Sequence, residues 1–347
     1  MKLKILSPLF IILILNGNIF SQYILTLPIG TRSLGMGGTG YAIANDGTAT
    51  FFNPAILGMR NPRFYGGEAQ YFREPMIFDV VRSYYSLNWQ HQQLNKFGFS
   101  VYSNQIDGGN SDVIDTNRNV IDSWHTIDIS GAIGIGYCFY KNNILTHSTG
   151  IAAKYYRSSI ISEQDGEKYH GYALSYDLGY LLQIIDKFRL GIVIKNLGPR
   201  VNWKENDSTT DKIGQTSLFA AGIGYIDNFD HGKLKVLTFS IELSFRKFID
   251  ESYGLDKDKL LTGFECNLFN TIQLRSGYNR FFEDELKSIN EFSFGTGISL
   301  FNHFNVDIFW SFDDDGFEID DPQYGFSISM TRILEWNKKD KKWWRKF

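Results

Sequence analysis

Apolar and polar residues alternate at nearly every second position over most of the chain after residue 64. In GYALSYDLGYLLQ (171–183), tyrosine and leucine occupy the even positions, and alanine, serine, aspartate and glycine occupy the odd positions from 173 to 179. The segments 126–140, 291–300 and 324–331 repeat this arrangement. Strict period-two alternation places unlike side chains on the two faces of a β-strand. The pattern therefore predicts β-structure over residues 64–333.

Counting these runs predicts about fourteen strands, and an even number of strands is typical of bacterial outer-membrane barrels. The expected strands lie near residues 64–71, 79–90, 95–107, 122–140, 144–160, 169–184, 188–198, 216–226, 233–248, 260–269, 271–281, 289–301, 303–312 and 324–333. The predicted fold class is all-β, a transmembrane antiparallel β-barrel of about 14 strands.

The connections between these strands alternate in length. Short connections follow the even-numbered strands, for example 141–143, 185–187 and the single residue 270. Long polar connections follow most odd-numbered strands, namely 108–121, 161–168, 199–215, 249–259, 282–288 and 313–323. Outer-membrane barrels sort their connections in this way, with short turns in the periplasm and long loops outside the cell. The pattern therefore predicts that both termini of the barrel are periplasmic.

Alternation alone does not say which face points outward, and the expected size of the barrel decides the question. A closed barrel of about fourteen strands encloses a lumen too wide for its own side chains to fill. One face of these strands is rich in glycine, alanine and serine, which are too small to pack such an interior. We therefore expect the tyrosine, phenylalanine, leucine and isoleucine face to contact lipid, around a lumen that needs a plug.

The amino terminus is typical of a secretory signal peptide. A basic start, MKLK, precedes an apolar run that ends before Ser21 and Gln22, and we expect cleavage after Ser21. After this segment no apolar run approaches the roughly 20 residues that a membrane helix needs. The composition, with 29 Phe, 19 Tyr and 33 Gly, also fits an exported β-protein, and the net charge of −3 points to no nucleic acid partner.

Residues 22–63 precede the first strand and are expected to form the plug. They contain GMGGTG (35–40), which has the glycine spacing of a dinucleotide-binding turn. No buried strand precedes this segment and no helical periodicity follows it, so we exclude nucleotide binding and assign the glycines to sharp backbone turns close to the wall. Asn53 before Pro54 predicts a helix cap with proline at the first helical position.

The stretch GTRSLGMGGTGYAIANDGTATFFNPAIL (30–57) resembles the amino-terminal signature of the PorV/PorQ family, within the FadL-like superfamily of outer-membrane transporters. The plug residues that carry the resemblance are Arg32, Gly35, Met36, Gly37, Gly38, Ala42, Ala44, Asp46, Gly47, Ala49, Asn53, Pro54 and Ala55. The chain departs from close PorV relatives at residues 30–34, where they more often have an acidic-alanine-arginine start.

The resemblance implies an outer-membrane barrel of a Gram-negative, Bacteroidota-like bacterium, surrounded by membrane lipid and lipopolysaccharide. Two functions follow from it. PorV/PorQ-like members are accessory or shuttle components of type IX protein secretion, and their partners are secretion-system proteins. FadL-like members take up hydrophobic small molecules such as fatty acids. The first is our leading hypothesis and the second is its alternative.

An outer-membrane hydrolase is a distant third hypothesis, and we expect no enzyme activity. His147 and Ser148 are adjacent in a strand, so their side chains point to opposite faces and do not form a dyad. No histidine or cysteine spacing resembles a zinc site, and no cofactor is expected. Cys138 and Cys266 lie in separate expected strands; isolated thiols are the preferred reading, and a disulfide stays open.

Three acids fall on the small-residue face of the expected strands and are therefore predicted to face the lumen: Asp128, Asp177 and Glu242. An acid that faces a filled lumen needs hydrogen-bonding partners. We expect these acids to anchor the plug, with Arg32 as a candidate partner. A polar path through the lumen is the alternative.

Two further segments are unusual in charge. The outer loop 313–323 contains Asp313, Asp314, Asp315, Asp320 and Asp321, which suggest either a weak divalent-cation site shared with lipopolysaccharide or a solvated loop. Its spacing excludes an EF-hand. The tail 334–347 combines six lysines and arginines with three tryptophans, which suits a periplasmic membrane surface or partner, or a disordered solubilising end.

Overall fold

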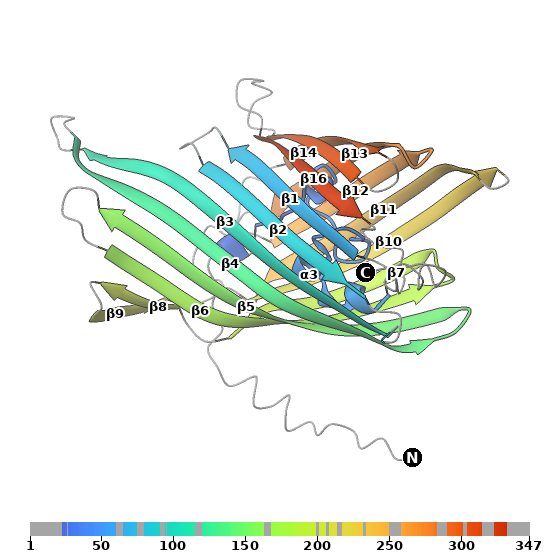
Figure 1. The fold of residues 1–347 in the computed structure, drawn as a ribbon, viewed down its shortest axis with the longest axis horizontal. Coiled ribbons are helices and arrows are strands. Elements are labelled where there is room, and N and C mark those ends of the chain that lie inside the picture. The colour runs from blue at the N-terminus through green and yellow to red at the C-terminus, as the bar shows by residue number, and fades with distance from the viewer. Residues whose placement is uncertain are drawn as a thin grey trace, which may run out of the picture.

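The computed structural model describes residues 23–25, 27–59, 65–74, 80–90, 94, 96–114, 120–162, 168–198, 201–205, 208–213, 217–231, 234–249, 258–282, 290–300, 304–313 and 323–331. These residues form one antiparallel sheet that closes on itself, because β1 pairs with β16 and β5 pairs with β6 (Figure 1). The predicted antiparallel barrel is confirmed.

The strands are β1 (Tyr65–Glu74), β2 (Val80–Trp89), β3 (Phe97–Ile114), β4 (Val120–Lys141), β5 (Leu145–Ser162), β6 (Lys168–Ile184), β7 (Phe188–Leu197), β8 (Val201–Glu205), β9 (Ser208–Ile213), β10 (Leu218–His231), β11 (Leu234–Phe248), β12 (Asp258–Leu268), β13 (Ile272–Phe282), β14 (Asn290–Leu300), β15 (Phe304–Asp313) and β16 (Gln323–Thr331). β8 follows β7 along the same edge of β6, and β9 pairs with β8 as β10 pairs with β7. Strands β7 and β8 therefore share one position in the wall, and β9 and β10 share the next. Counted in this way, the sixteen described strands fill the expected fourteen positions.

A tight turn of the wall links β12 and β13 at residues 268–271. Phe269 and Asn270 have φ angles of 54° and 53°, and the Thr271 N–H donates to the Leu268 carbonyl at 2.9 Å. Two successive positive φ angles inside such a hydrogen bond are the signature of a type I′ turn, whose twist matches that of the paired strands. This explains how a connection predicted to be a single residue joins two strands.

The wall is much taller on one side. Strands β3 to β6 contain 18, 22, 18 and 17 residues, whereas β12 to β16 contain 9 to 11. About 9–11 residues suffice to cross a membrane, so the taller strands continue beyond it (Figure 1). We call this extension the collar; it comprises residues 108–114, 120–128, 157–162 and 168–176 together with β8 and β9.

The collar corrects two of the loop predictions. Residues 108–114, 120–121, 201–205 and 208–213, within the expected loops 108–121 and 199–215, belong to strands of the sheet. In the expected loop 161–168, residues 161, 162 and 168 extend β5 and β6, and residues 163–167 lie outside the described residues. Above the membrane neither face of the sheet contacts lipid, so selection for alternating apolar residues ends there, while the backbone hydrogen bonds continue. For this reason period-two patterning underestimates the length of these strands.

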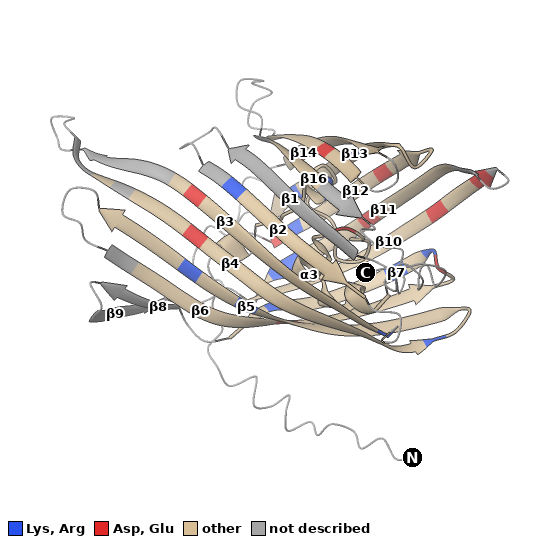
Figure 2. Cartoon of the chain, viewed as in Figure 1, with Lys and Arg blue, Asp and Glu red and all other residues tan. Residues whose placement is uncertain are grey.

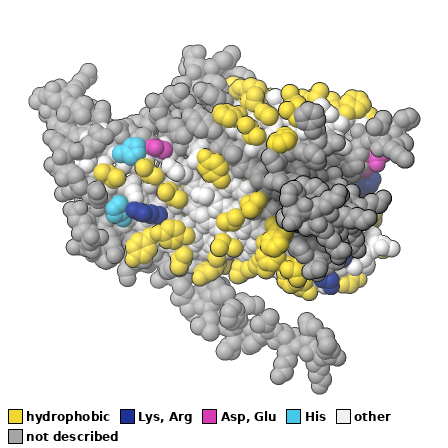
Figure 3. Space-filling model, in the orientation of Figure 1, with side chains coloured by type: hydrophobic (Ala, Val, Ile, Leu, Met, Phe, Trp, Pro, Cys, Tyr) yellow, Lys and Arg dark blue, Asp and Glu magenta, His cyan; other side chains and the backbone are white. Residues whose placement is uncertain are grey.

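Large apolar side chains cover the outward face of the barrel. Ile133 is 71% exposed and Leu174 is 53% exposed, while Ala132 and Ala173 on the opposite face are buried. Figure 3 shows these side chains as an interrupted apolar band over one side of the molecule. Within the described part of the chain, no helix has the length and apolar character needed to cross a bilayer.

Replacing Ile133 with lysine is expected to destabilise the folded barrel by about 2–4 kcal/mol, because a charge on the lipid face near the bilayer midplane loses its hydration. The control is Ile133→Phe, which keeps the residue apolar. Urea unfolding of the protein in lipid vesicles measures the difference. Equal stability of the two variants would show that residue 133 does not contact acyl chains.

The segment before β1 lies inside the barrel, where it forms the plug (27–59) (Figure 1). It consists of short helices, α2 (Thr31–Leu34), α3 (Ala49–Phe52) and η2 (Pro54–Met59), and η1 (Tyr23–Leu25) precedes it. The plug packs with wall residues such as Tyr84, Tyr102 and Leu181 in one buried apolar cluster. The expected signal peptide 1–21 and tail 334–347 lie outside the described residues.

Candidate functional site: the plug and the wall around it

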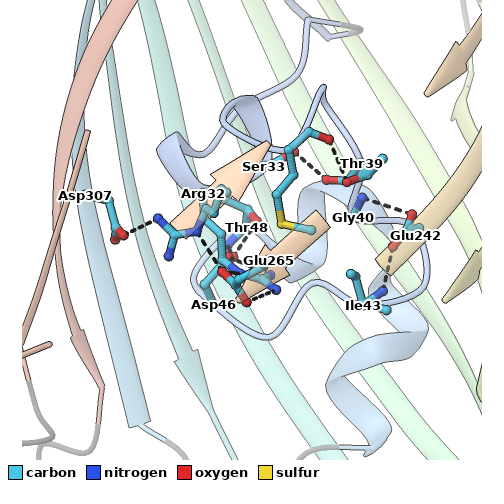
Figure 4. Close-up of polar contacts among 12 residues, drawn as sticks. Arg32, Ser33, Thr39, Gly40, Ile43, Asp46, Thr48, Glu242, Glu265 and Asp307 are labelled. Carbon is cyan, nitrogen blue, oxygen red and sulfur yellow. Dashed lines mark hydrogen bonds and ion pairs between the residues drawn. The ribbon is translucent and has the colours of Figure 1, made fainter. Parts of the chain in front are cut away.

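One wall carboxylate holds four consecutive amides of the plug. Glu242 of β11 is fully buried, and its Oε1 accepts the N–H groups of Gly40 and Tyr41 at 3.0 and 2.8 Å. Its Oε2 accepts those of Ala42 and Ile43 at 3.2 and 3.0 Å (Figure 4). Successive N–H groups that converge in this way form an anion-binding nest. The plug backbone thereby compensates a charge that would otherwise be costly to bury.

A second anchor is a buried ionic network centred on the adjacent strand β12 (Figure 4). The Arg32 guanidinium donates from Nε and Nη2 to the two oxygens of Glu265 in β12, at 2.8 and 2.9 Å. Its Nη1 lies 3.5 Å from Asp46, within the plug itself. Arg275 of β13 bonds the same Glu265 at 2.7 Å and also pairs with Asp307 of β15. Bidentate arginine–carboxylate contacts of this kind fix the orientation of the arginine as well as its position.

The charge state of Arg32 is secured by its partners. Burial disfavours the guanidinium cation, but the Glu265 carboxylate and then Asp46 outweigh burial and hold the pKa of Arg32 above its ordinary value. The cation is therefore permanent at any physiological pH.

The partner of Arg32 differs from the one that the sequence suggested. Arg32 pairs with Glu265 and Asp46 rather than with Asp128, Asp177 or Glu242. Glu265, Arg275 and Asp307 were not singled out, although each occupies a small-residue position of a strand whose neighbours, such as Phe264 and Ile308, point to lipid. A charged residue at a small-residue position of a strand is the sequence signal that would have identified them as inward-facing. Figure 2 shows charged residues in the middle of wall strands as well as at their ends.

Further hydrogen bonds join the plug to other strands of the wall. The Asn53 amide donates to the wall carbonyl of Tyr180, and its Oδ1 accepts the Ala55 N–H at 3.0 Å, which is the helix cap expected before Pro54. Ser148 donates to the Ala55 carbonyl at 2.6 Å. Further ties connect Tyr84 with the Gly47 carbonyl and Arg82 with the carbonyls of residues 27 and 28. The plug is thus bonded to strands around most of the ring.

A row of wall glycines lets the plug backbone approach the strands. Gly98, Gly136, Gly150 and Gly179 are direct cross-strand neighbours on β3 to β6. A Cβ added at any of several wall glycines would lie closer than 3.0 Å to plug backbone; they are Gly98, Gly136, Gly150, Gly191, Gly263 and Gly277. On the plug side, Gly37 has a φ of +68° and faces the backbone of residue 278. The glycines of GMGGTG thus serve close packing against the wall.

Asp177 holds a wall cluster beside the plug. Its Oδ1 accepts the Asn196 N–H at 2.8 Å and lies 2.7 Å from the Lys154 Nζ, which also bonds the Asn196 side chain. Lys195 is fully buried, its Nζ makes no hydrogen bond to the described residues, and it lies 3.6 Å above the ring of Phe51 in the plug. Asp177 therefore stabilises the bend at the end of β7 and does not bond the plug directly.

Replacing Lys195 with methionine is expected to raise the free energy of unfolding by about 1–2 kcal/mol. Methionine keeps the volume and the contact with Phe51 but removes a buried amino group that makes no hydrogen bond to any residue the structure describes. Urea titration in lipid vesicles measures the change, and Lys247→Met on the exposed face of β11 is the control. A loss of stability in Lys195→Met would mean that the ammonium group contributes more through Phe51 and Asp177 than its burial costs.

Apart from Ser148, the other sites considered in the sequence take no part in the plug contacts described above. Asp128 accepts the Tyr156 hydroxyl at 3.1 Å in the collar. Ser148 faces the plug, while His147 contacts the Tyr180 hydroxyl on the other face, as expected from their adjacency. Both cysteines are free thiols. Asp314, Asp315, Asp320 and Asp321 lie outside the described residues, as does the side chain of Asp313.

The described residues contain no cluster of three or more histidine, cysteine or carboxylate side chains that would hold a metal ion. A small apolar cluster lies on the inner face near the collar, where Ile24 and Leu25 of η1 pack against Tyr156 and Ala173, with Ile106 beside them. Sequence reasoning did not identify this contact, because η1 directly follows the expected signal peptide and carries no pattern of its own.

No protein-family model matches this chain, and no curated protein sequence does either. Solved structures do match in fold. The monoaromatic hydrocarbon channel CymD aligns over 90% of this chain and 99% of its own, with a TM-score of 0.56 and 13% identity. The toluene transporters TodX of P. putida and TbuX of Ralstonia pickettii each align over 88% of this chain and 98% of their own, with a TM-score of 0.53 and 12% identity.

At such low identity these matches establish the fold, which is that of β-barrel outer-membrane channels. They do not show membership of the PorV/PorQ family.

Proposed function

We propose that this protein is a plugged outer-membrane channel that admits a hydrophobic small molecule. The observation that carries the proposal is the fold match, which extends over nearly the whole length of channels that are named for monoaromatic hydrocarbons and toluene. The barrel of this chain is filled by its own amino-terminal segment, held by polar contacts that a conformational change can break and remake.

The apolar cluster at the collar suits the entry of such a molecule. Ile24 and Leu25 occupy an apolar site between Tyr156 and Ala173. A hydrophobic ligand of similar size would replace these side chains with little change in buried apolar area, and the displaced segment connects directly to the plug. Ligand binding here would therefore pull on the plug from its amino-terminal end.

Movement of the plug would also create an apolar path. Much of the inner wall is serine, asparagine or charged residues, which do not favour an apolar molecule. The exceptions are wall residues now covered by the plug, including Tyr84, Tyr102, Leu181 and Val193. Once the plug moves, these side chains become the apolar surface of the lumen. The interface between plug and wall would then both close the channel and, once opened, line the path of the ligand.

Uptake of radiolabelled toluene into proteoliposomes tests the proposal. The full-length protein is expected to accelerate uptake over protein-free liposomes, and Leu25→Asp is expected to reduce it by placing a charge in the apolar cluster. Leu94→Asp, an exposed residue at the short-turn end, is the matched control. Uptake equal to that of protein-free liposomes, for toluene and for a fatty acid alike, would contradict a channel function.

The secretion accessory is the second candidate, and the collar favours it. A wall that extends beyond the membrane on one side provides a protein-contact surface that a simple channel does not need. Deleting the gene should then abolish surface display of type IX cargo while hydrocarbon uptake is unchanged. Normal cargo display in the deletion strain would eliminate this candidate.

Both candidates share one orientation, in which the short turns and both termini of the barrel are periplasmic and the collar stands outside a Gram-negative, Bacteroidota-like cell. The length asymmetry of the connections supports it. Single cysteines introduced at 270 and at 110 in a Cys138→Ser, Cys266→Ser background would test it with a membrane-impermeant maleimide on intact cells. Labelling at 270 and not at 110 would show that the barrel has the opposite orientation.

A further inference from the structure

A group of polar and charged side chains lies on the outward face at the base of the collar, directly above the apolar band. We call it the outer patch; it consists of Asp107, His125, Arg157, Ser159 and His170, from the four adjacent strands β3 to β6. Arg157 is exposed, and both histidines are partly exposed. Figure 3 shows histidine, basic and acidic side chains together at this end of the apolar band.

The strand register places these groups within reach of one another. His170 is directly opposite Ser159, and its Nδ1 lies 3.1 Å from the serine hydroxyl. Arg157 is two residues from Ser159 on the same face, so it is a diagonal neighbour of His170, about 7–8 Å away between Cα atoms. His125 is opposite Ile161, one row further along β5. A ligand that spans two or three rows would contact all three nitrogen-bearing side chains.

The patch has an excess of basic groups. Its one carboxylate, Asp107, lies 3.4 Å from the Nε2 of His125. Among the described residues no carboxylate forms an ion pair with Arg157 or His170. The guanidinium of Arg157 is exposed on this face, and an arginine fork matches the geometry of a phosphate.

The same strands change to lipid-facing residues immediately below the patch. Tyr172 is the cross-strand neighbour of Arg157 and is 39% exposed, and Leu174 and Ile133 beyond it are more exposed still. Aromatic side chains at this level are typical of the boundary between acyl chains and headgroups. A molecule bound here would have its acyl chains against Leu174 and Ile133 and its acidic group against Arg157.

We propose that the outer patch binds a phosphate of the lipid A portion of lipopolysaccharide. Lipopolysaccharide combines acyl chains with phosphates in the outer leaflet, which the proposed orientation places at the level of the collar. The inference rests on that orientation and not on what the channel transports. Arg157 would hold the phosphate, His170 would donate a hydrogen bond through its ring, and Ser159 would orient the imidazole.

Binding of purified full-length protein in detergent to immobilised lipid A tests the proposal. The double variant Arg157→Gln, His170→Gln is expected to bind about tenfold more weakly, because each lost bond to a charged phosphate contributes on the order of a kilocalorie. The matched control is Lys96→Gln, Lys141→Gln, which removes two exposed basic groups at the short-turn end. Heat-modifiable migration in gels confirms that each variant is a folded barrel.

Dephosphorylated lipid A and phosphatidylglycerol provide the two decisive comparisons. Wild-type protein should bind dephosphorylated lipid A as weakly as the double variant binds the intact molecule. Equal binding by wild type and double variant would overturn the proposal, and so would an equal loss in the control. If the double variant loses affinity for phosphatidylglycerol to the same extent, the patch recognises any lipid phosphate and the assignment to lipopolysaccharide is wrong. Toluene uptake by the double variant should be unchanged, which separates this site from the proposed function.

Discussion

Replacing Glu242 with alanine is expected to release the plug from β11. The variant leaves the N–H groups of Gly40, Tyr41, Ala42 and Ile43 without the carboxylate that accepts all four. Each buried amide left unsatisfied costs about 1–3 kcal/mol, so the loss for all four should be at least about 4 kcal/mol. Amide hydrogen exchange in residues 40–43 should then accelerate by about 100-fold or more.

Two further variants identify the cause. Glu242→Gln keeps one carbonyl oxygen but turns an NH₂ group toward two N–H donors, so exchange should be intermediate. Asp227→Ala removes a carboxylate from the adjacent strand β10 that bonds Lys187 and Tyr225 rather than the plug, so plug exchange should stay at the wild-type rate. Wild-type exchange in Glu242→Ala would mean that the nest is not an anchor, because only the wall acid changes.

The second large effect is expected from a single methyl group on the inner wall. In Gly277→Ala the new Cβ would lie closer than 3.0 Å to the backbone of Gly37 and Met36. Backbone atoms do not move aside as a flexible side chain does, so the plug must shift as a unit and give up contacts on this side of the barrel. Overpacking of this kind costs about 1–3 kcal/mol where side chains can adjust, and more where they cannot.

Ion conductance in planar bilayers measures this displacement. Gly277→Ala should conduct more than the wild type, and protease should cleave it within residues 27–59 while the wall resists. Gly108→Ala is the matched control, since its added Cβ would meet only Thr126 at an ordinary 3.5 Å. Wild-type conductance and resistance in Gly277→Ala would show that the plug tolerates a shift at this contact without opening.

These variants also show where sequence reasoning stopped. Alternation identified Glu242 as an inward-facing residue, because Ile241 and Leu243 beside it are apolar. It did not identify what Glu242 binds, because the partners are backbone amides 199 to 202 positions away. Nearly every residue has a backbone N–H group, so the residue types in the sequence do not show which of these groups bind Glu242. Arg32 was assigned to the wrong acids for a related reason. Five or more inward acids were available to it, and only the register of β12, β13 and β15 selects Glu265.

The amino-acid sequence by itself determined the class of the molecule and the two faces of its wall. Strands within the membrane have lipid on one side and the lumen on the other, so each position records its environment in its own residue type, as at Ile133 and Ala132. The tertiary structure decided what depends on relations between distant segments: the height of the collar, the contacts of the plug, and the grouping of Arg157 with His170. Closing the barrel sets the register of every strand against its neighbours, and no single segment contains that information.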